Sequence, residues 1–152
     1  MERLNKELIF VTLSRIASIS EQSIYCDLLR VFHQNGYNIT IISPVERKLK
    51  INTNLREADK ICYLEIKTFN IQKSNFLEKG LGTILISYQY IQAIKKYLKN
   101  KKFDLILIKQ TIHFFNLRDI NKILSYSHAS LEVGGIILIL TLDRKNNEIP
   151  TF

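Results

Sequence analysis

The chain has 152 residues, 46% of them hydrophobic, with five glycines, two prolines and a formal net charge of +8 at pH 7. This length and composition favour one compact domain and exclude disordered and collagen-like proteins. The positive charge favours ligands or surfaces that carry phosphate. Its two basic clusters, residues 47–50 and 95–102, lack the alternation of basic and aromatic residues that binds single-stranded nucleic acid, so we expect no nucleic-acid partner.

Cysteine and histidine are too few, and too widely spaced, for a disulfide framework or a metal site. The chain has two cysteines without a CxxC spacing and three histidines. The first residues are polar and lack the apolar core of a signal peptide, and no apolar run is long enough to span a bilayer. We therefore expect no metal and a cytoplasmic location, with peripheral contact at the inner face of the cell membrane through the basic residues.

The first forty-four residues predict a strand, a helix and a second strand. Residues 8–13 form a continuous apolar run that is typical of a strand covered on both faces. Ser18 and Glu21 have the spacing of a capping box and predict the start of a helix. A second apolar run, residues 37–43, predicts the next strand, and Pro44 is expected to end it.

The predicted helix carries apolar residues at helical spacing and ends at Gly36, which permits a left-handed cap. The stripe expected to face the core contains Ile24, Leu28 and Val31, with Tyr25, Leu29 and Phe32 beside it.

The rest of the chain repeats the alternation of strand and helix. Residues 45–60 are polar and predict a surface excursion. Gly134 and Gly135 are expected to lead into the last strand. Further strands are expected at residues 61–68, 103–108 and 136–142, and helices at residues 83–99 and 117–131. This alternation predicts a single α/β domain, Rossmann-like and doubly wound, whose mainly parallel sheet has helices on both faces.

Ligands of such sheets bind beyond the carboxyl ends of the strands, which draws attention to three loops. The last of these, residues 143–147, is short and charged and is interpreted as a solvated surface turn. The loop after the first strand offers Ser14, Arg15, Ser18 and Glu21 as substrate-binding candidates. It contains no glycine, so the backbone cannot approach a dinucleotide closely, and we expect no NAD or FAD and no other bound cofactor. The alternative for this loop is that its serines only cap the helix.

The second loop follows residues 103–108 and offers Lys109 and His113. His113 lies among apolar residues, where a histidine is more often a hydrogen-bonded packing residue than a catalytic group. Neither loop contains a Walker sequence, a zinc-protease motif or a paired-carboxylate motif, so the catalytic residues stay unknown.

The first two thirds of the chain resemble a known family. The segments that carry the resemblance are FVTLSRI (residues 10–16), SIYCDLLR (23–30), GYNITIISPVER (36–47), KTFNIQKSN (67–75), EKG (78–80) and AIKKY (93–97). Their order is similar to that in the N-terminal half of the bacterial family 4 glycosyltransferases, which assemble surface polysaccharides.

The resemblance implies the acceptor-side domain of a hexosyltransferase that has two Rossmann-like domains facing across a cleft. The partners implied are a nucleotide sugar and a lipid-linked glycan acceptor, once a donor-binding domain is supplied. That second domain has no counterpart in this sequence, so we expect the chain alone to be inactive.

After about residue 108 the resemblance changes. Residues 103–115 (FDLILIKQTIHFF), the turn LEVGG (131–135) and the strand at 136–142 resemble the C-terminal part of a class I methyltransferase that uses S-adenosylmethionine. Residues 109–152 would then be a fused tail that completes the sheet of residues 1–108. The glycine-rich turn and the acidic residue at the end of the second strand, which such enzymes use for their cofactor, are both missing. Two alternatives remain: a methyltransferase-like protein, and a binding module or fusion remnant without catalysis.

Overall fold

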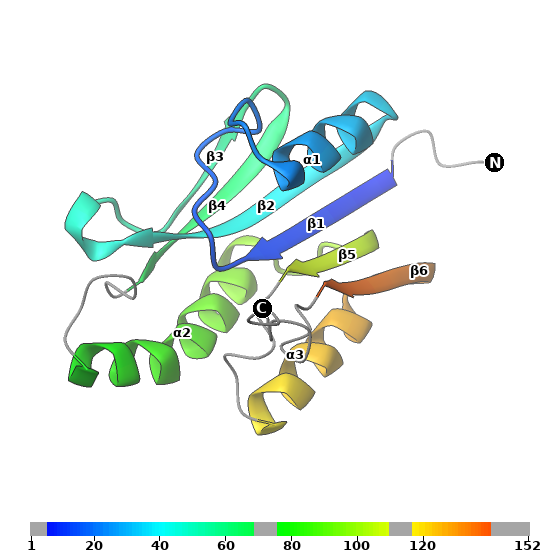
Figure 1. The fold of residues 1–152 in the computed structure, drawn as a ribbon. Coiled ribbons are helices and arrows are strands. Elements are labelled where there is room, and N and C mark those ends of the chain that lie inside the picture. Colours follow the sequence, from blue (N-terminus) through cyan, green and yellow to red (C-terminus); the bar gives the residue numbers. More distant parts are fainter. Residues whose placement is uncertain (1–5, 69–75, 110–116, 141–152) are drawn as a thin grey trace, which may run out of the picture.

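A computed structural model describes residues 6–68, 76–109 and 117–140 of the chain, and Figure 1 shows their arrangement. In chain order the elements are β1 (Lys6–Thr12), α1 (Ile24–Gln34), β2 (Tyr37–Glu46), the 3-10 turn η1 (Arg47–Leu49), β3 (Asn54–Ala58), β4 (Ile61–Thr68), α2 (Phe76–Tyr97), β5 (Phe103–Lys109), α3 (Leu117–Ala129) and β6 (Leu131–Leu140).

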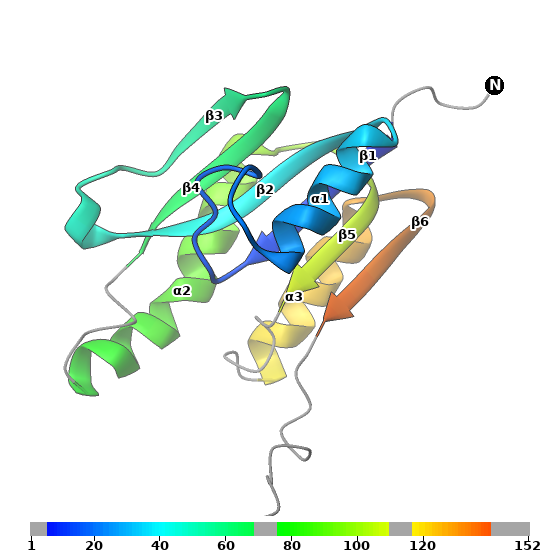
Figure 2. The same ribbon diagram turned by 45° about the horizontal axis from the view of Figure 1, so that its top comes forward.

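The described strands form one sheet in the order β3-β4-β2-β1-β5-β6. All neighbouring pairs are parallel except β3 and β4, which form an antiparallel hairpin at one edge. Helix α1 lies on one face, and α2 and α3 lie on the other (Figures 1 and 2). The expected Rossmann-like α/β fold with a mainly parallel sheet and helices on both faces is therefore confirmed.

Each face of the sheet has its own buried core. Leu8, Phe10 and Ile41 pack on the α1 side with Leu29 of the helix. Ile9, Ile42 and Leu64 point the other way and pack with Ile86 and other residues of α2. Successive residues of a strand point to opposite faces, so strands buried on both sides must be apolar without alternation.

The strand order reverses between β1 and β5. From β1 the chain crosses by α1 to β2 on one side, whereas from β5 it crosses by α3 to β6 on the other side. The helices of the two crossovers, α1 and α3, lie on opposite faces of the sheet. The reversal of strand order between β1 and β5 is the topological switch point at which open α/β sheets bind ligands.

The second strand does not stop at Pro44, as the sequence suggested, but runs on to Glu46. Its pairing with β1 ends at Ile42, whereas its pairing with β4 continues through Pro44 to Glu46. Beyond Ile42 one side of β2 has no ladder partner within the described residues. A proline can occupy a strand there because its missing N–H removes no sheet hydrogen bond.

Helix α1 differs from the prediction in its start and in its buried face. It begins at Ile24, and the N-cap is Ser23, whose side chain accepts a hydrogen bond from the N–H of Cys26. The predicted capping box of Ser18 and Glu21 lies five residues upstream, in a turn. The buried stripe contains Cys26 and Leu29 with Tyr25 and Phe32 beside them. The predicted stripe of Ile24, Leu28 and Val31 is exposed instead.

Two further boundaries were wrong. The polar segment 45–60 is not only a surface excursion, because it contains the edge strand β3. The last strand begins at Leu131, so Gly134 and Gly135 lie within it rather than before it. The register with β5 passes from Phe103–Leu131 to Leu105–Ile136, and the extra residues of β6 form an irregularity that contains both glycines.

Candidate functional site

The carboxyl ends of β1 and β5 meet at the switch point. Thr12 and Lys109, the last residues of the two strands, are register partners. Ser14 and Arg15 follow β1 directly, and both are exposed. The structure thus brings three sequence-predicted residues, Ser14, Arg15 and Lys109, to the same edge of the sheet.

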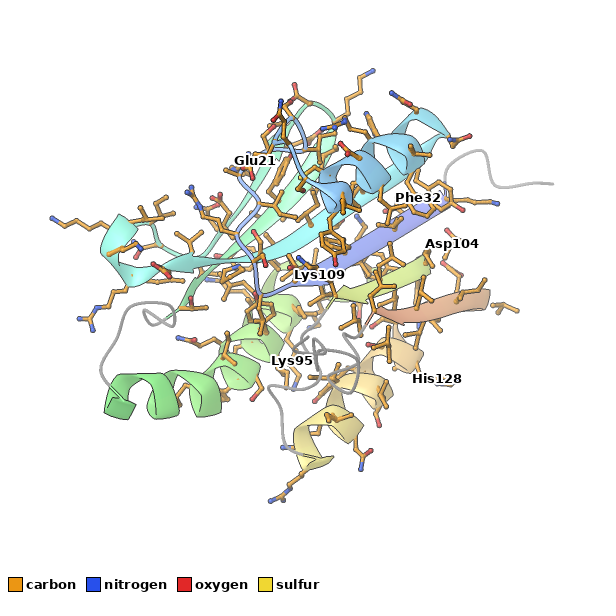
Figure 3. All side chains as sticks on the ribbon, viewed as in Figure 1. Glu21, Phe32, Lys95, Asp104, Lys109 and His128 are labelled. Atoms are coloured by element: carbon orange, nitrogen blue, oxygen red, sulfur yellow. The ribbon has the colours of Figure 1, made fainter. Side chains whose placement is uncertain are left out.

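Lys109 lies at the carboxyl end of β5, beside the end of β1 (Figure 3). Its Nζ lies 3.7 Å from the centroid of the Tyr25 ring, on the first turn of α1. Partial burial lowers the pKa of the Lys109 ammonium, and the nearby Cys26 thiol opposes that change. Among the described residues, no carboxylate forms an ion pair with Lys109. A partly desolvated cation without an acidic partner is a suitable anion-binding group.

The end of β1 is fixed from the opposite face of the sheet. The hydroxyl of Tyr90, on α2, donates a hydrogen bond of 2.7 Å to the carbonyl oxygen of Thr12. Burial raises the pKa of Tyr90 well above its ordinary value, so this hydroxyl keeps its proton and its role as donor. The Thr12 hydroxyl oxygen accepts from the N–H of Ser14 at 3.0 Å. These contacts hold the backbone beside Lys109 in one conformation.

The other two predicted residues of the first loop, Ser18 and Glu21, hold the loop together. The Glu21 carboxylate accepts hydrogen bonds from the N–H groups of Ala17, at 2.8 Å, and Ser18, at 3.2 Å. The Ser18 hydroxyl oxygen accepts from the N–H of Ser20 at 3.1 Å. Figure 3 shows Glu21 well away from Lys109. The structure therefore separates Ser18 and Glu21 from the three residues at the switch point.

The loop itself folds over the α1 face, against β2 and β4. Ile16 and Ile19 are buried in the core of that face. The N–H of Ile19 donates to the hydroxyl of Tyr63, and the Ser43 hydroxyl donates to the carbonyl of Ile16. The connection from β2 to β4 contains no α-helix, so this loop covers a part of the sheet that a crossover helix covers in a fully alternating α/β fold.

An ion pair that the sequence analysis missed fixes the loop from the β3 edge. Arg56 of β3 lies 3.3 Å from the carboxylate of Glu65 and 4.1 Å from the centroid of the Tyr63 ring, and it donates to the carbonyl of Ala17. Glu65 is only 5% exposed. A glutamate inside an otherwise apolar strand was the available signal, because a buried carboxylate needs a partner. Its partner could not be identified without the pairing of β3 and β4.

The acidic residue at the end of β2, Glu46, is not placed as the ribose-binding acid of a methyltransferase would be. The register places Ser43 beside the end of β1, and Glu46 lies three residues further along the strand. The Glu46 carboxylate is paired with Lys48. Three residues of strand span about 10 Å, so Glu46 is far from the position of a ribose-binding acid beside β1.

Neither a metal site nor a membrane span is found in the parts of the chain that the structure describes. No group of three or more histidine, cysteine, aspartate or glutamate residues is placed to hold a metal ion there. None of the helices in those parts is long and apolar enough to cross a bilayer. His113, the remaining candidate, lies outside the described residues.

Comparison with models of known protein families gave no match, and comparison with curated protein sequences gave none either.

Proposed function

We propose that this chain is a glycosyltransferase-like, acceptor-side domain that binds a phosphorylated ligand at the switch point and does not transfer a sugar by itself. One observation carries the proposal: the Lys109 ammonium lies on the Tyr25 ring at the junction of β1 and β5, with no carboxylate partner in the described part of the chain. The ligand class is a sugar phosphate or the diphosphate of a lipid-linked glycan.

The environment of Lys109 supports an anionic ligand. Burial costs the ammonium part of its hydration and lowers its pKa. A phosphate oxygen would replace that hydration with a charge-assisted hydrogen bond and would raise the pKa again. Arg15, exposed just beyond β1, supplies a second cation at the same edge. Tyr90 and Thr12 already fix the backbone between these groups, so little ordering would accompany binding.

The same edge lacks what sugar transfer requires. Transfer from a nucleotide sugar needs a general base and several preorganised contacts to the leaving diphosphate. Within the described residues, Glu21 is the carboxylate of this loop, and it accepts two backbone hydrogen bonds at a distance from Lys109. We therefore assign the nucleotide-sugar contacts to a separate donor-binding domain.

The test is titration calorimetry with glucose 1-phosphate. Replacement of Lys109 by methionine keeps the apolar stem on Tyr25 and removes the charge. Loss of a charge-assisted hydrogen bond should weaken binding about tenfold or more. Lys96→Met is the matched control, because Lys96 is an exposed lysine of α2 beside Tyr97, and it should leave the affinity unchanged. Equal affinities for the two variants would overturn the switch-point site.

An activity assay tests the second half of the proposal. The purified chain, given nucleotide sugars and a polyprenyl-linked acceptor, should release no nucleotide diphosphate. Turnover by the chain alone would show that the acceptor-side assignment is incomplete.

A further inference from the structure

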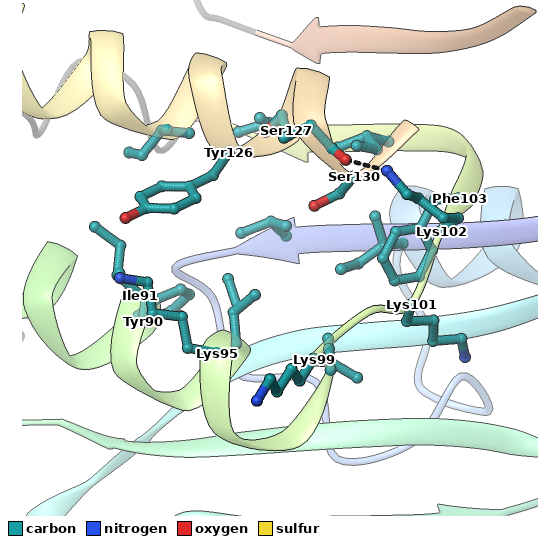
Figure 4. A pocket seen from close by; sticks show the side chains of 18 of the residues that line it. Tyr90, Ile91, Lys95, Lys99, Lys101, Lys102, Phe103, Tyr126, Ser127 and Ser130 are labelled. Atoms are coloured by element: carbon teal, nitrogen blue, oxygen red, sulfur yellow. Dashed lines mark hydrogen bonds between the residues drawn. The ribbon is translucent and has the colours of Figure 1, made fainter. Parts of the chain in front are cut away.

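A cavity lies between α2 and α3, on the face of the sheet opposite α1 (Figure 4). Its volume is about 620 Å³, within the range of pockets that enclose small organic ligands. The floor is apolar and comes from β1 and β5, including Ile9, Val11, Ile106 and Ile108. Phe103 closes one end. The switch point uses none of these side chains.

The polar groups of the cavity lie on the helices and the α2–β5 turn. Figure 4 shows Lys95 and Tyr126 reaching toward each other from the two helices, and the Lys95 Nζ lies 4.9 Å from the centroid of that ring. Lys99 and Lys102 also line the cavity, and Lys102 donates to the carbonyl of Ala129. Among the described lining residues there is no aspartate or glutamate.

The net charge at the rim of the cavity, which we define by Lys95, Lys99, Lys101 and Lys102, is positive. Of its four lysines, Lys101 is neutralised by Glu7, at 3.1 Å. Helices α2 and α3 both end near the rim, and each C-terminus carries about half a negative charge. The three lysines without a carboxylate partner among the described residues, less the partial negative charges of the two helix ends, leave about two positive charges beside an apolar cavity.

We propose that the cavity between α2 and α3 binds a monomeric, single-chain anionic amphiphile, with its alkyl chain on the sheet floor and its carboxylate or phosphate group at Lys95, Lys99 and Lys102. A ligand with polar groups along its length would leave them unpaired against the aliphatic floor, which is unfavourable. A purely apolar ligand would leave the lysine rim unused. This inference does not depend on the proposed function of the switch point.

The first experiment varies the ligand and needs no variant protein. Calorimetry with octyl, decyl and dodecyl phosphate, each as monomer, should show affinity rising at least about tenfold over the series, because each buried methylene contributes about 0.8 kcal/mol. Dodecanol and inorganic phosphate should each bind more weakly than dodecyl phosphate. An affinity that does not depend on chain length, or that inorganic phosphate matches, would overturn the proposal.

A pair of substitutions on α3 then locates the site. Ser127 lines the cavity, whereas Ser125 is an exposed serine of the same helix that does not. Ser127→Trp should fill the cavity and weaken dodecyl phosphate binding at least about tenfold, while Ser125→Trp leaves it unchanged. Lys99→Ala should weaken binding about two- to fivefold, the usual value of an exposed charge pair, and Lys96→Ala should not. Equal binding by the two tryptophan variants would place the ligand elsewhere.

A last arm separates a monomeric ligand from a membrane surface, which would also attract these lysines. Sedimentation with phosphatidic acid vesicles should show weak binding that is lost as salt rises and is the same for both tryptophan variants. Dodecyl phosphate binding should keep its dependence on Ser127 at the same salt. If dodecyl phosphate binding is lost at the same salt concentration as vesicle binding, electrostatic attraction to the protein surface explains both, and the proposal is overturned.

Discussion

The two edges of the sheet are built in opposite ways. The β3 edge is five residues long, carries Arg56 and Glu57, and is closed by a tight hairpin. The β6 edge is ten residues long, has no charged residue after Glu132, and exposes Ile136 and Leu138. Edge strands with charges and short lengths resist pairing with other chains, whereas long apolar ones invite it. Within the described residues, side chains therefore protect the β3 edge against pairing with another chain, and the β6 edge has no such protection.

The α1 face of the sheet is also covered near the β3 edge and exposed near the β6 edge. Ile136 and Leu138 are register partners of Leu105 and Leu107, which belong to the α1 face, so they point to that face as well. Near β3 the first loop covers this face. Near β6 the described residues leave Ile136 and Leu138 exposed on this face. The apolar surface at this edge therefore includes part of the sheet face as well as the edge strand.

The largest expected effect is at the β3 edge. Arg56→Ala would leave Glu65 buried without a partner and would release the loop at Ala17. Breaking a buried pair costs several kcal/mol, and because the Arg56 side chain is 34% exposed we expect a loss of about 2–3 kcal/mol in the free energy of unfolding. Urea denaturation measures it. The neighbouring exposed change Glu57→Ala should stay within about 0.5 kcal/mol.

A double variant shows whether the buried charge is the cause. Adding Glu65→Gln to Arg56→Ala removes the unpaired carboxylate and should recover at least half of the lost stability. If the double variant is no more stable than Arg56→Ala, packing of the guanidinium on Tyr63 explains the loss and the ion pair does not.

The irregularity in β6 provides the next test. A Cβ on Gly135 would lie 3.0 Å from the carbonyl oxygen of Phe103 and 3.0 Å from a methyl carbon of Leu131. Gly135→Ala should therefore lower the free energy of unfolding by about 1–3 kcal/mol, as overpacking does. Gly134 has a φ of 80° with open space around it, and asparagine is one of the residues that adopt such a φ at low cost, so Gly134→Asn should destabilise less than Gly135→Asn. Equal effects of the two asparagine changes would contradict this register of β5 and β6.

Most of the sheet could be predicted from the sequence because its central strands are buried on both faces. β1, β4 and β5 appear in the sequence as short continuous apolar runs, and their alternation with helices predicted a mainly parallel sheet. Ser14, Arg15 and Lys109 lie at the carboxyl ends of two of these strands, where parallel sheets bind their ligands, and this selected them as candidates. What those residues bind stays a prediction.

The parts that could not be predicted depend on tertiary pairing. Helix α1 has two apolar stripes, one through Ile24 and Leu28 and one through Tyr25 and Leu29, and periodicity alone does not say which faces the sheet. Strand β3 has weak β propensity and exists because it pairs with β4. Ser18 and Glu21 have the spacing of a capping box, but Ser23 supplies the cap.

The hairpin of the β3 edge offers a smaller effect, and in the stabilising direction. Asp59 and Lys60 both have positive φ, 53° and 61°, between the paired residues Ala58 and Ile61. Such two-residue turns favour Asn-Gly, because a side chain on a left-handed residue costs about 1–2 kcal/mol and glycine avoids that cost. Asp59→Asn with Lys60→Gly should therefore raise the free energy of unfolding by about 1 kcal/mol. Lys60→Ala, the control, should give no gain, and a gain from alanine would show that charge rather than backbone conformation matters.

The smallest effect on stability is expected at the β6 edge, where the readout is association. Leu138 of β6 and Leu55 of β3 are exposed edge leucines with similar exposures, 48% and 41%. Each should accept lysine with a change of no more than about 0.5 kcal/mol in the free energy of unfolding.

Sedimentation velocity over a range of protein concentrations should nevertheless distinguish the Leu138→Lys variant from the Leu55→Lys variant. The unchanged chain should associate as concentration rises, because within residues 6–68, 76–109 and 117–140 the outer side of β6 has no strand partner and carries apolar side chains. Leu138→Lys should suppress this association, and Leu55→Lys should not. If both lysine variants associate as the unchanged chain does, the two edges are equivalent in solution and the contrast between them has no consequence for partners.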